Sequence, residues 1–200
     1  MNKKIENFFR EDINSLSEYK VLDSKGMVKL DAMENPFDLS VNFEISNLSS
    51  GLISLNRYPD ADSKNLRDQL QKKYNLNSKK DVIIGNGSDE LIQLICLAFL
   101  RTENTVLCPE PSFSMYKSIS KVIGLRYEEA PLKEDFSLDI NLMLNKIDEF
   151  DPAIIFLAFP NNPTGNLWSK NDIKSIIKKS NGVVACTETW DGSSWTEKSD

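Results

Sequence analysis

From residue 81 onward, apolar residues gather in two alternating patterns. Short apolar runs predict buried strands, and apolar residues spaced three or four apart predict helices that bury one face. The predicted strands are 81–84, 105–108, 125–129, 153–158 and 183–186, and the predicted helices between them are 88–100, 112–123, 140–150 and 170–179. Because strands and helices alternate, we expect an α/β fold with a mostly parallel sheet and helices on both faces.

The chain on either side of this region has a different character. Residues 1–20 have the pattern of a polar amphipathic arm. A helix that begins at Ser63 is predicted by apolar residues at every fourth position, which are Leu66, Leu70 and Tyr74. Residues 185–200 hold two of the three tryptophans and no aliphatic residue larger than alanine, so they are a poor continuation of a buried α/β core.

Composition excludes several classes of protein. With 40% hydrophobic and 27% charged residues, the 200-residue chain is an ordinary globular sequence that can bury a core. Its net charge of -6 argues against binding to nucleic acid, whose phosphates require a basic face. The longest nearly apolar segment, 91–100, is too short to span a membrane, and the amino terminus lacks the apolar core of a signal peptide.

The chain contains no histidine. This excludes Ser-His-Asp and Cys-His catalysis and every zinc site that needs an imidazole, so we expect no metal site. The three cysteines are an odd number without C-x-x-C spacing, which favours a reduced, cytoplasmic compartment over a disulfide framework. Any proton transfer must use Lys, Tyr, Asp, Glu or a cofactor.

A phosphate site is predicted at Gly85-Asn86-Gly87-Ser88-Asp89-Glu90, which joins a predicted strand to an apolar helix. The free N–H groups and the positive dipole end at the start of a helix attract a phosphate, and glycines let the backbone approach it. The alternative is structural, because Asn-Gly is a common tight turn and Ser or Asp a common helix cap.

Two other candidate site residues follow predicted strands. Asn162 lies in the turn Asn161-Asn162-Pro163-Thr164-Gly165, directly after the apolar run 153–159. Phe113 follows another strand end, where its ring can stack on a flat heterocycle. Because open α/β sheets bind ligands at the carboxyl ends of their strands, both positions are candidates for a site. The alternatives are a plain turn and a core phenylalanine.

Taken in order, four segments resemble one family, the histidinol-phosphate aminotransferases, which are fold-type-I enzymes dependent on pyridoxal 5'-phosphate (PLP). The segments are Leu30-Asp31-Ala32-Met33-Glu34-Asn35-Pro36, Asn56-Arg57-Tyr58-Pro59, Gly85 to Leu91, and Asn161 to Asn166. The resemblance runs from about Gly26 to Val184. It implies an incomplete three-layer α/β/α domain, the PLP-binding large domain of these transferases, with an N-terminal extended and helical arm.

The resemblance also implies a role for each matching position. The amides around Gly87, Ser88 and Asp89 would hold the cofactor phosphate. Tyr58 would reach the phosphate of the neighbouring subunit in a homodimer. The implied reaction moves an amino group between glutamate and imidazole-acetol phosphate, giving histidinol phosphate in histidine biosynthesis.

The other two implied roles concern the cofactor ring. Phe113 would stack on the pyridine ring, and Asn162 would hydrogen-bond the ring hydroxyl. The family has an Asp that pairs with the pyridine nitrogen, but this chain has Thr187 at that position, and a hydroxyl cannot supply the negative charge.

The lysine that binds the cofactor as a Schiff base lies beyond the end of the chain, so no catalytic residue is assigned. We therefore expect a truncated or frame-shifted aminotransferase that is foreign from about Ala185, inactive on its own and marginally stable. The alternatives are another class I or II aminotransferase, of aromatic or broad specificity, and a non-catalytic interaction module.

The expected domain organisation follows from the same resemblance. Residues 1–55 form the arm and a small-domain segment, 56–186 a partial PLP-binding large domain, and 187–200 a polar tail that does not match the family. As relatives tend to have cis peptide bonds at these strand ends, we expect Glu110-Pro111 and Asn162-Pro163 to be cis.

Overall fold

The structure is a computed structural model of the chain, and it describes residues 3–14, 16–17, 26–28, 34–35, 37, 57–76 and 81–187. The elements in chain order are α1 (Lys3–Glu6), α2 (Glu11–Asn14), α3 (Lys64–Lys73), α4 (Gly87–Ala98), β1 (Thr105–Glu110), α5 (Ser114–Ile123), β2 (Arg126–Pro131), α6 (Ile140–Phe150), β3 (Ile154–Ala158), α7 (Lys170–Lys179) and β4 (Val183–Thr187).

The chain divides into two compact units. One consists of Met1–Leu16 with Gly85–Asp200, and it contains every element except α3. The other is Ser17–Ile84. The domain boundaries after residues 55 and 186 stay predictions, and the polar tail from residue 188 onward lies outside the described residues.

Four parallel strands form one sheet in the order β2-β1-β3-β4. In the centre Val106 of β1 lies beside Ile154 of β3, and Ile154 also lies beside Val183 of β4. β1 and β3 are buried along nearly their whole length because each has a strand on both sides and helices over both faces. The predicted strand and helix alternation is therefore confirmed from α4 onward.

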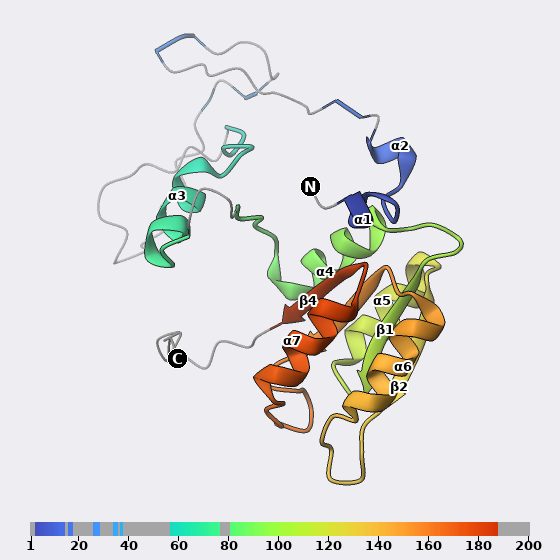
Figure 1. The fold of residues 1–200 in the computed structure, drawn as a ribbon. Coiled ribbons are helices and arrows are strands. Elements are labelled where there is room, and N and C mark those ends of the chain that lie inside the picture. The colour runs from blue at the N-terminus through green and yellow to red at the C-terminus, as the bar shows by residue number, and fades with distance from the viewer. Residues whose placement is uncertain are drawn as a thin grey trace. The chain divides into compact units, whose positions relative to one another are not determined.

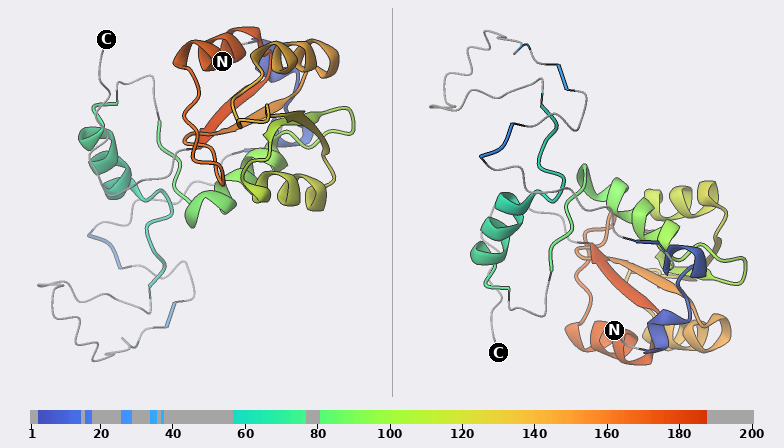
Figure 2. Two further views of the ribbon diagram at one scale, coloured as in Figure 1. Left: turned by 90° about the horizontal axis from the view of Figure 1, so that it is seen from below. Right: turned by 90° about the horizontal axis from the view of Figure 1, so that it is seen from above.

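Side chains alternate between the two faces of the sheet, and each face has its own core. On one face Val106, Cys108 and Phe156 pack with buried residues of α4 and α5. On the other face Leu107 and Ile155 pack with buried residues of α6 and α7. Figure 2 (left) shows the three layers, with α6 and α7 in orange shades on one side of the sheet and α4 and α5 in green shades on the other. The three-layer α/β/α fold class is confirmed.

The strand predicted at 81–84 is wrong. The structure gives these residues no regular secondary structure, and the Ile83 side chain is 78% exposed. An apolar run becomes a strand only where a neighbouring strand takes up its backbone hydrogen bonds. All four strands in the described part of the chain come after residue 104, and none of them pairs with 81–84.

Two helices begin close to the residues that the sequence indicates. α3 begins after Ser63 as predicted, but the Ser63 side chain does not cap it. The carboxylate of Asp60 takes that role, because it accepts a hydrogen bond from the backbone N of Lys64 at 2.8 Å. α7 begins after Ser169, whose hydroxyl accepts a hydrogen bond from the backbone N of Asn171 at 3.2 Å.

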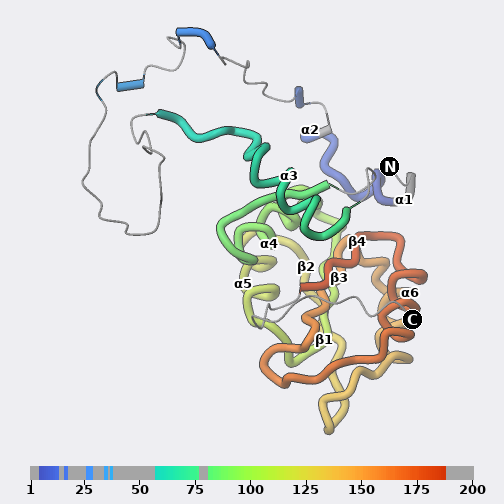
Figure 3. The backbone as a smooth tube through the Cα atoms, turned by 90° about the vertical axis from the view of Figure 1, so that its left-hand side faces the viewer, coloured from blue at the N-terminus to red at the C-terminus, as the bar shows by residue number. Residues whose placement is uncertain are grey.

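The short helices α1 and α2 lie at the amino edge of the sheet, where α4 leads into β1. The guanidinium of Arg101 donates to the carbonyl of Asn7 at 2.7 Å, and the amide of Asn104 donates to the carbonyl of Phe8 at 2.8 Å. Figures 1 and 3 show α1 at the opposite end of the sheet from the yellow loop that follows β2. The arm therefore covers the edge at which the strands begin.

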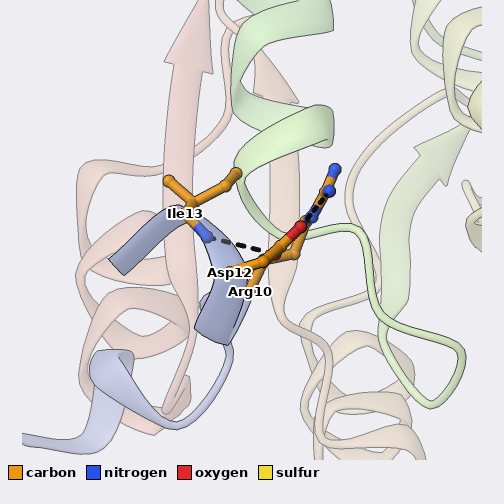
Figure 4. A network of polar contacts seen from close by, with 3 residues as sticks. All are labelled: Arg10, Asp12 and Ile13. Atoms are coloured by element: carbon orange, nitrogen blue, oxygen red, sulfur yellow. Dashed lines mark hydrogen bonds and ion pairs between the residues drawn. The ribbon is translucent and has the colours of Figure 1, made fainter. Parts of the chain in front are cut away.

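A polar network fixes the start of α2 (Figure 4). Arg10 donates from Nε and Nη2 to the two carboxylate oxygens of Asp12, at 3.0 Å and 2.5 Å. The backbone N of Ile13 donates to the same carboxylate at 3.1 Å. Because the hydrogen bonds from Arg10 favour the charged form, the pKa of Asp12 is lowered.

Candidate active site

The carboxyl ends of β1 and β3 lie side by side at the centre of the sheet. The chain leaves β1 toward α5, which packs on one face, and leaves β3 toward α7, which packs on the other face. Neighbouring strands whose connections depart to opposite faces define the switch point at which open α/β sheets bind ligands. The loops after β1 and β3 are therefore the first place to look for a site.

The side chain of Asn161 joins these two loops. It is only 2% exposed, and its Oδ1 accepts a hydrogen bond from the hydroxyl of Ser112 at 2.9 Å. Its Nδ2 donates to the carbonyl of Pro111 at 2.9 Å and to the hydroxyl of Thr164 at 2.9 Å. One buried amide thus satisfies polar groups of both loops, as a buried polar side chain must.

A hydrogen bond from β2 also fixes the position of the loop after β1. The carboxylate of Glu110 accepts one hydrogen bond from the phenol of Tyr127 at 2.8 Å and another from the backbone N of Ser112 at 3.1 Å. Burial raises the pKa of Tyr127 well above its usual range, so the phenol keeps its proton and remains a donor. The chain from 110 to 112 is therefore fixed on both sides.

Aromatic rings line the α5 side of the switch point. Tyr116 is fully buried and stacks on Phe156 of β3, with ring centroids 4.7 Å apart and planes 3° apart. Phe113 meets the edge of Tyr116 at 5.4 Å with an angle of 85° between the rings. The phenol of Tyr116 hydrogen-bonds the hydroxyl of Thr187 at the end of β4. Burial raises the pKa of Tyr116 to about 12, so this pair of hydroxyls is neutral.

Two of the predicted site residues flank the switch point. Phe113 is half-buried, directly before α5. Asn162 is exposed, and its side chain has no hydrogen-bond partner among the described residues. The peptide bonds Glu110-Pro111 and Asn162-Pro163 are cis as predicted, and Phe159-Pro160 is a third cis bond that the sequence did not predict.

The predicted phosphate residues form the first turn of α4. This helix ends just before the amino end of β1, so it runs antiparallel to the strands and its first turn points toward the carboxyl edge (Figure 1). Ser88 and Asp89 are exposed, and no side chain caps the helix at Asn86. Gly87 has a φ of 77° with open space where a Cβ would stand. The backbone N–H of Gly87 donates to the carbonyl of Gly85 at 3.0 Å, whereas the N–H groups of Ser88 and Asp89 have no acceptor within the helix and are accessible.

Tyr58 belongs to the other compact unit, Ser17–Ile84, and its role toward the cofactor stays a prediction. Its side chain is 69% exposed. Its backbone N donates to the carboxylate of Glu34 at 2.8 Å, and Arg57 forms an ion pair with the same carboxylate at 2.8 Å. Two of the motifs that carry the family resemblance are thus held together by Glu34.

Sequence reasoning missed the residues that organise this edge. The sequence predicts only a turn at Asn161, whereas in the structure this side chain is buried, unlike that of its neighbour Asn162. The sequence predicts Ser112 and Tyr116 only as parts of a helix, whereas Ser112 precedes α5 and its hydroxyl donates a hydrogen bond to Asn161. A sequence signal for Asn161 does exist, because two asparagines in a row after a buried strand offer one inward and one outward amide.

Other kinds of site find no support in the part of the chain that the structure describes. No cluster of His, Cys, Asp and Glu side chains there could hold a metal ion. None of the described helices has the length and apolar character needed to cross a membrane.

Comparison with known sequences identifies the family. The sequence model of the family "Aminotransferase class I and II" matches residues 27–199. This chain belongs to that aminotransferase family. It is 42% identical over 190 residues to "Histidinol-phosphate aminotransferase 2" of Nitrosococcus oceani, a match that covers 94% of this chain and 52% of the relative. It is 40% identical over 183 residues to the histidinol-phosphate aminotransferase of Thiocapsa roseopersicina, a match that covers 90% of this chain and 96% of that relative.

Solved aminotransferases share the fold. A putative histidinol-phosphate aminotransferase from Erwinia carotovora atroseptica matches with a TM-score of 0.59 and 22% identity, over 66% of this chain and 38% of that one. The histidinol-phosphate aminotransferase of Sinorhizobium meliloti in complex with pyridoxal-5'-phosphate matches with a TM-score of 0.59 and 19% identity. This match covers 65% of this chain and 35% of that one. The sequence matches, rather than the shared fold, confirm the family resemblance. The chain spans about half the length of several curated relatives, among them the Nitrosococcus protein.

Proposed function

We propose that this chain supplies the phosphate-binding and ring-binding part of a PLP-dependent histidinol-phosphate aminotransferase. The reaction is amino transfer between glutamate or 2-oxoglutarate and histidinol phosphate or imidazole-acetol phosphate. The observation that carries the proposal is the placement of Phe113 and exposed Asn162 on either side of the switch point, in a chain 42% identical to a relative of that name.

The residues present fit three of the contacts that PLP needs. The open first turn of α4 offers the backbone N–H groups of Ser88 and Asp89 to the phosphate, whereas the N–H of Gly87 already donates to the carbonyl of Gly85. Phe113 offers a ring held edge-on by Tyr116, which keeps it in place to stack on the pyridine. When bound, PLP supplies the electron-withdrawing ring that amino transfer requires.

The ring hydroxyl and the ring nitrogen have different partners. Asn162 offers an amide that no other described side chain occupies, so it is available to donate to the ring hydroxyl. The position that we align with the ring nitrogen holds Thr187, which is bonded to Tyr116 and carries no charge. This edge therefore positions a cofactor better than it tunes the protonation of the ring.

The homodimer is part of the proposal. Tyr58 and its neighbour Arg57 form an exposed loop fixed by Glu34, and in a dimer Tyr58 would reach the cofactor phosphate of the neighbouring subunit.

The neutral Thr187 favours a second candidate function. A chain that binds the cofactor without an acidic partner for the ring nitrogen suits a non-catalytic subunit that pairs with a complete aminotransferase. Thr187→Asp, made in the protein that carries this chain, distinguishes the two candidates by turnover, because a carboxylate beside the ring nitrogen should increase turnover only if the site performs the reaction.

Cofactor binding is tested with pyridoxine 5'-phosphate, which has the ring, ring hydroxyl and phosphate but no aldehyde to react with surface lysines. Equilibrium dialysis against the chain measures its affinity. Asn162→Ala is expected to lower the affinity roughly 10-fold, the value of one hydrogen bond to the ligand. The matched control is Asn145→Ala, an exposed asparagine in the middle of α6, which should leave the affinity unchanged. Equal affinities for both variants, or no binding at all, would rule out this site.

The substrate is tested separately, on the protein that carries this chain. Glutamate formation from 2-oxoglutarate is measured with histidinol phosphate, phenylalanine and tyrosine as amino donors. We expect turnover with histidinol phosphate. Turnover with the aromatic amino acids alone would replace the proposed substrate with an aromatic one.

A further inference from the structure

Asn161 has a hydrogen-bonding arrangement that its neighbour Asn162 lacks. Its side-chain oxygen accepts from Ser112, and its side-chain nitrogen uses both hydrogens, on the carbonyl of Pro111 and the hydroxyl of Thr164. Both donors of the amide are therefore used, inside a residue that is 2% exposed. An amide in this state cannot contact a ligand directly, so any part it plays at the site is exerted through its partners.

The backbone of Asn161 closes the loop after β3. Its N–H donates to the carbonyl of Asn166 at 2.9 Å, and its carbonyl accepts from the N–H of Gly165 at 2.7 Å. Gly165 has a φ of 73°, the left-handed conformation that glycine adopts without strain. Asn162 is the first residue inside this closed turn, so the place of its amide depends on the bonds of Asn161.

The side chain of Asn161 also fixes the position of the loop after β1. It bonds both Pro111 and Ser112, and the next residue is Phe113. From the other direction Glu110 ties this loop to Tyr127 of β2. The ring of Phe113 thus follows a segment whose position relative to β3 is set by one amide.

We propose that Asn161 is a positioning residue, which fixes the ring of Phe113 and the amide of Asn162 relative to each other across the switch point between β1 and β3. This role rests on the proposed function, because it matters only if those two side chains hold one cofactor. Only a side chain that donates twice and accepts once meets this need. Aspartate lacks the donors, and alanine leaves the buried groups of Pro111 and Ser112 without partners.

The experiment separates positioning from general stability by comparing two buried asparagines. Asn104, 4% exposed, donates from Nδ2 to the carbonyls of Phe8 and Phe99 at 2.8 Å and 2.7 Å, at the opposite edge of the sheet. Asn161→Ala and Asn104→Ala are measured side by side. The readouts are the affinity for pyridoxine 5'-phosphate, the affinity for inorganic phosphate, and the induced circular dichroism in the absorption band of the bound ring.

We expect Asn161→Ala to lower the affinity for pyridoxine 5'-phosphate roughly 10-fold or more and to remove the induced dichroism. Its affinity for inorganic phosphate should stay within about 2-fold of the wild type, because α4 is untouched. Asn104→Ala should keep both the affinities and the dichroism. If the two variants change all three readouts equally, or if Asn161→Ala keeps the dichroism, the positioning role is refuted.

A milder pair of variants serves if Asn161→Ala does not fold. Thr164→Val removes the hydroxyl that accepts from Asn161 and should reduce the induced dichroism, whereas Thr164→Ser keeps the hydroxyl and should restore it. Equal signals from both variants would contradict the proposal. If the wild-type chain binds no pyridoxine 5'-phosphate, the proposed function fails first, and the role of Asn161 fails with it.

Discussion

The two edges of the sheet each contain a buried asparagine, and the two are used differently. At the amino edge, Asn104 donates to two backbone carbonyls, one in the arm at Phe8 and one at the end of α4 at Phe99. At the carboxyl edge, Asn161 bonds the loops after β1 and β3. Both amides satisfy buried polar groups, so neither burial nor hydrogen bonding tells the two edges apart.

What differs is the surface that each asparagine leaves uncovered. At the amino edge the arm packs on the sheet, with the rings of Phe9 and Phe99 4.5 Å apart. At the carboxyl edge Asn162 and the first turn of α4 stay exposed beside a buried network. A functional edge is thus recognised by exposed polar groups whose supports are buried, because a rigid support is what orients a binding group.

The largest expected effect comes from the amino edge. A Cβ on Gly182 would stand 2.4 Å from the backbone oxygens of Pro152 and Ala153, at the start of β4. Because backbone atoms cannot move aside easily, Gly182→Ala should lower the free energy of unfolding by about 3 kcal/mol. Urea unfolding, followed by tryptophan fluorescence, to which buried Trp168 contributes, measures the change.

The same variant sharpens the comparison of the edges. The fraction of Gly182→Ala that remains folded should bind pyridoxine 5'-phosphate with the wild-type affinity, because the carboxyl edge is unaltered. A loss of stability below about 1 kcal/mol would mean that the amino edge adapts readily. If Gly182→Ala lost affinity for pyridoxine 5'-phosphate without becoming less stable, the two edges would not be independent.

A smaller effect is expected from a pair of glycines with positive φ. Gly87 has a φ of 77° and Gly124 a φ of 95°, and a Cβ would meet no atom within 4 Å at either position. Each change to alanine should therefore cost about 1 kcal/mol of backbone strain. Only Gly87→Ala should also weaken binding of pyridoxine 5'-phosphate, by about 5-fold, because it displaces the first turn of α4. Dialysis of both variants measures this, and equal affinities would place the phosphate elsewhere.

The sequence predicted most of the layers but not the order of the strands. Apolar runs such as 153–158 predict strands because a strand buried on both faces needs apolar side chains at every position. The run Val82–Ile84 has the same composition and is not a strand, because no described strand lies beside it. Pairing depends on the whole chain and is absent from the local pattern.

The candidate site was predictable to the same extent. The sequence predicts Phe113 and Asn162 as site residues because each follows a strand, and the parallel sheet brings strand ends to one edge. The role of Asn161 depends on β3 lying next to β1, with β2 on the other side of β1. That adjacency follows from how the helices cross the sheet, so no local pattern around Asn161 contains it.

The smallest expected effect concerns the pH dependence of the arm at the amino edge. The hydrogen bonds from Arg10 hold the pKa of Asp12 below its ordinary value of 3.8. A lowered folded pKa means that the contribution of this pair is present above the unfolded pKa and is lost as the pH falls through the folded pKa. Carbon NMR titration should give Asp12 a pKa below 3.8, and Arg10→Gln should raise this pKa back toward 3.8. Since both side chains are at the protein surface, added salt should reduce the shift. Binding of pyridoxine 5'-phosphate at the carboxyl edge should not follow this titration, and if it did, the arm would belong to the site rather than to the edge it covers.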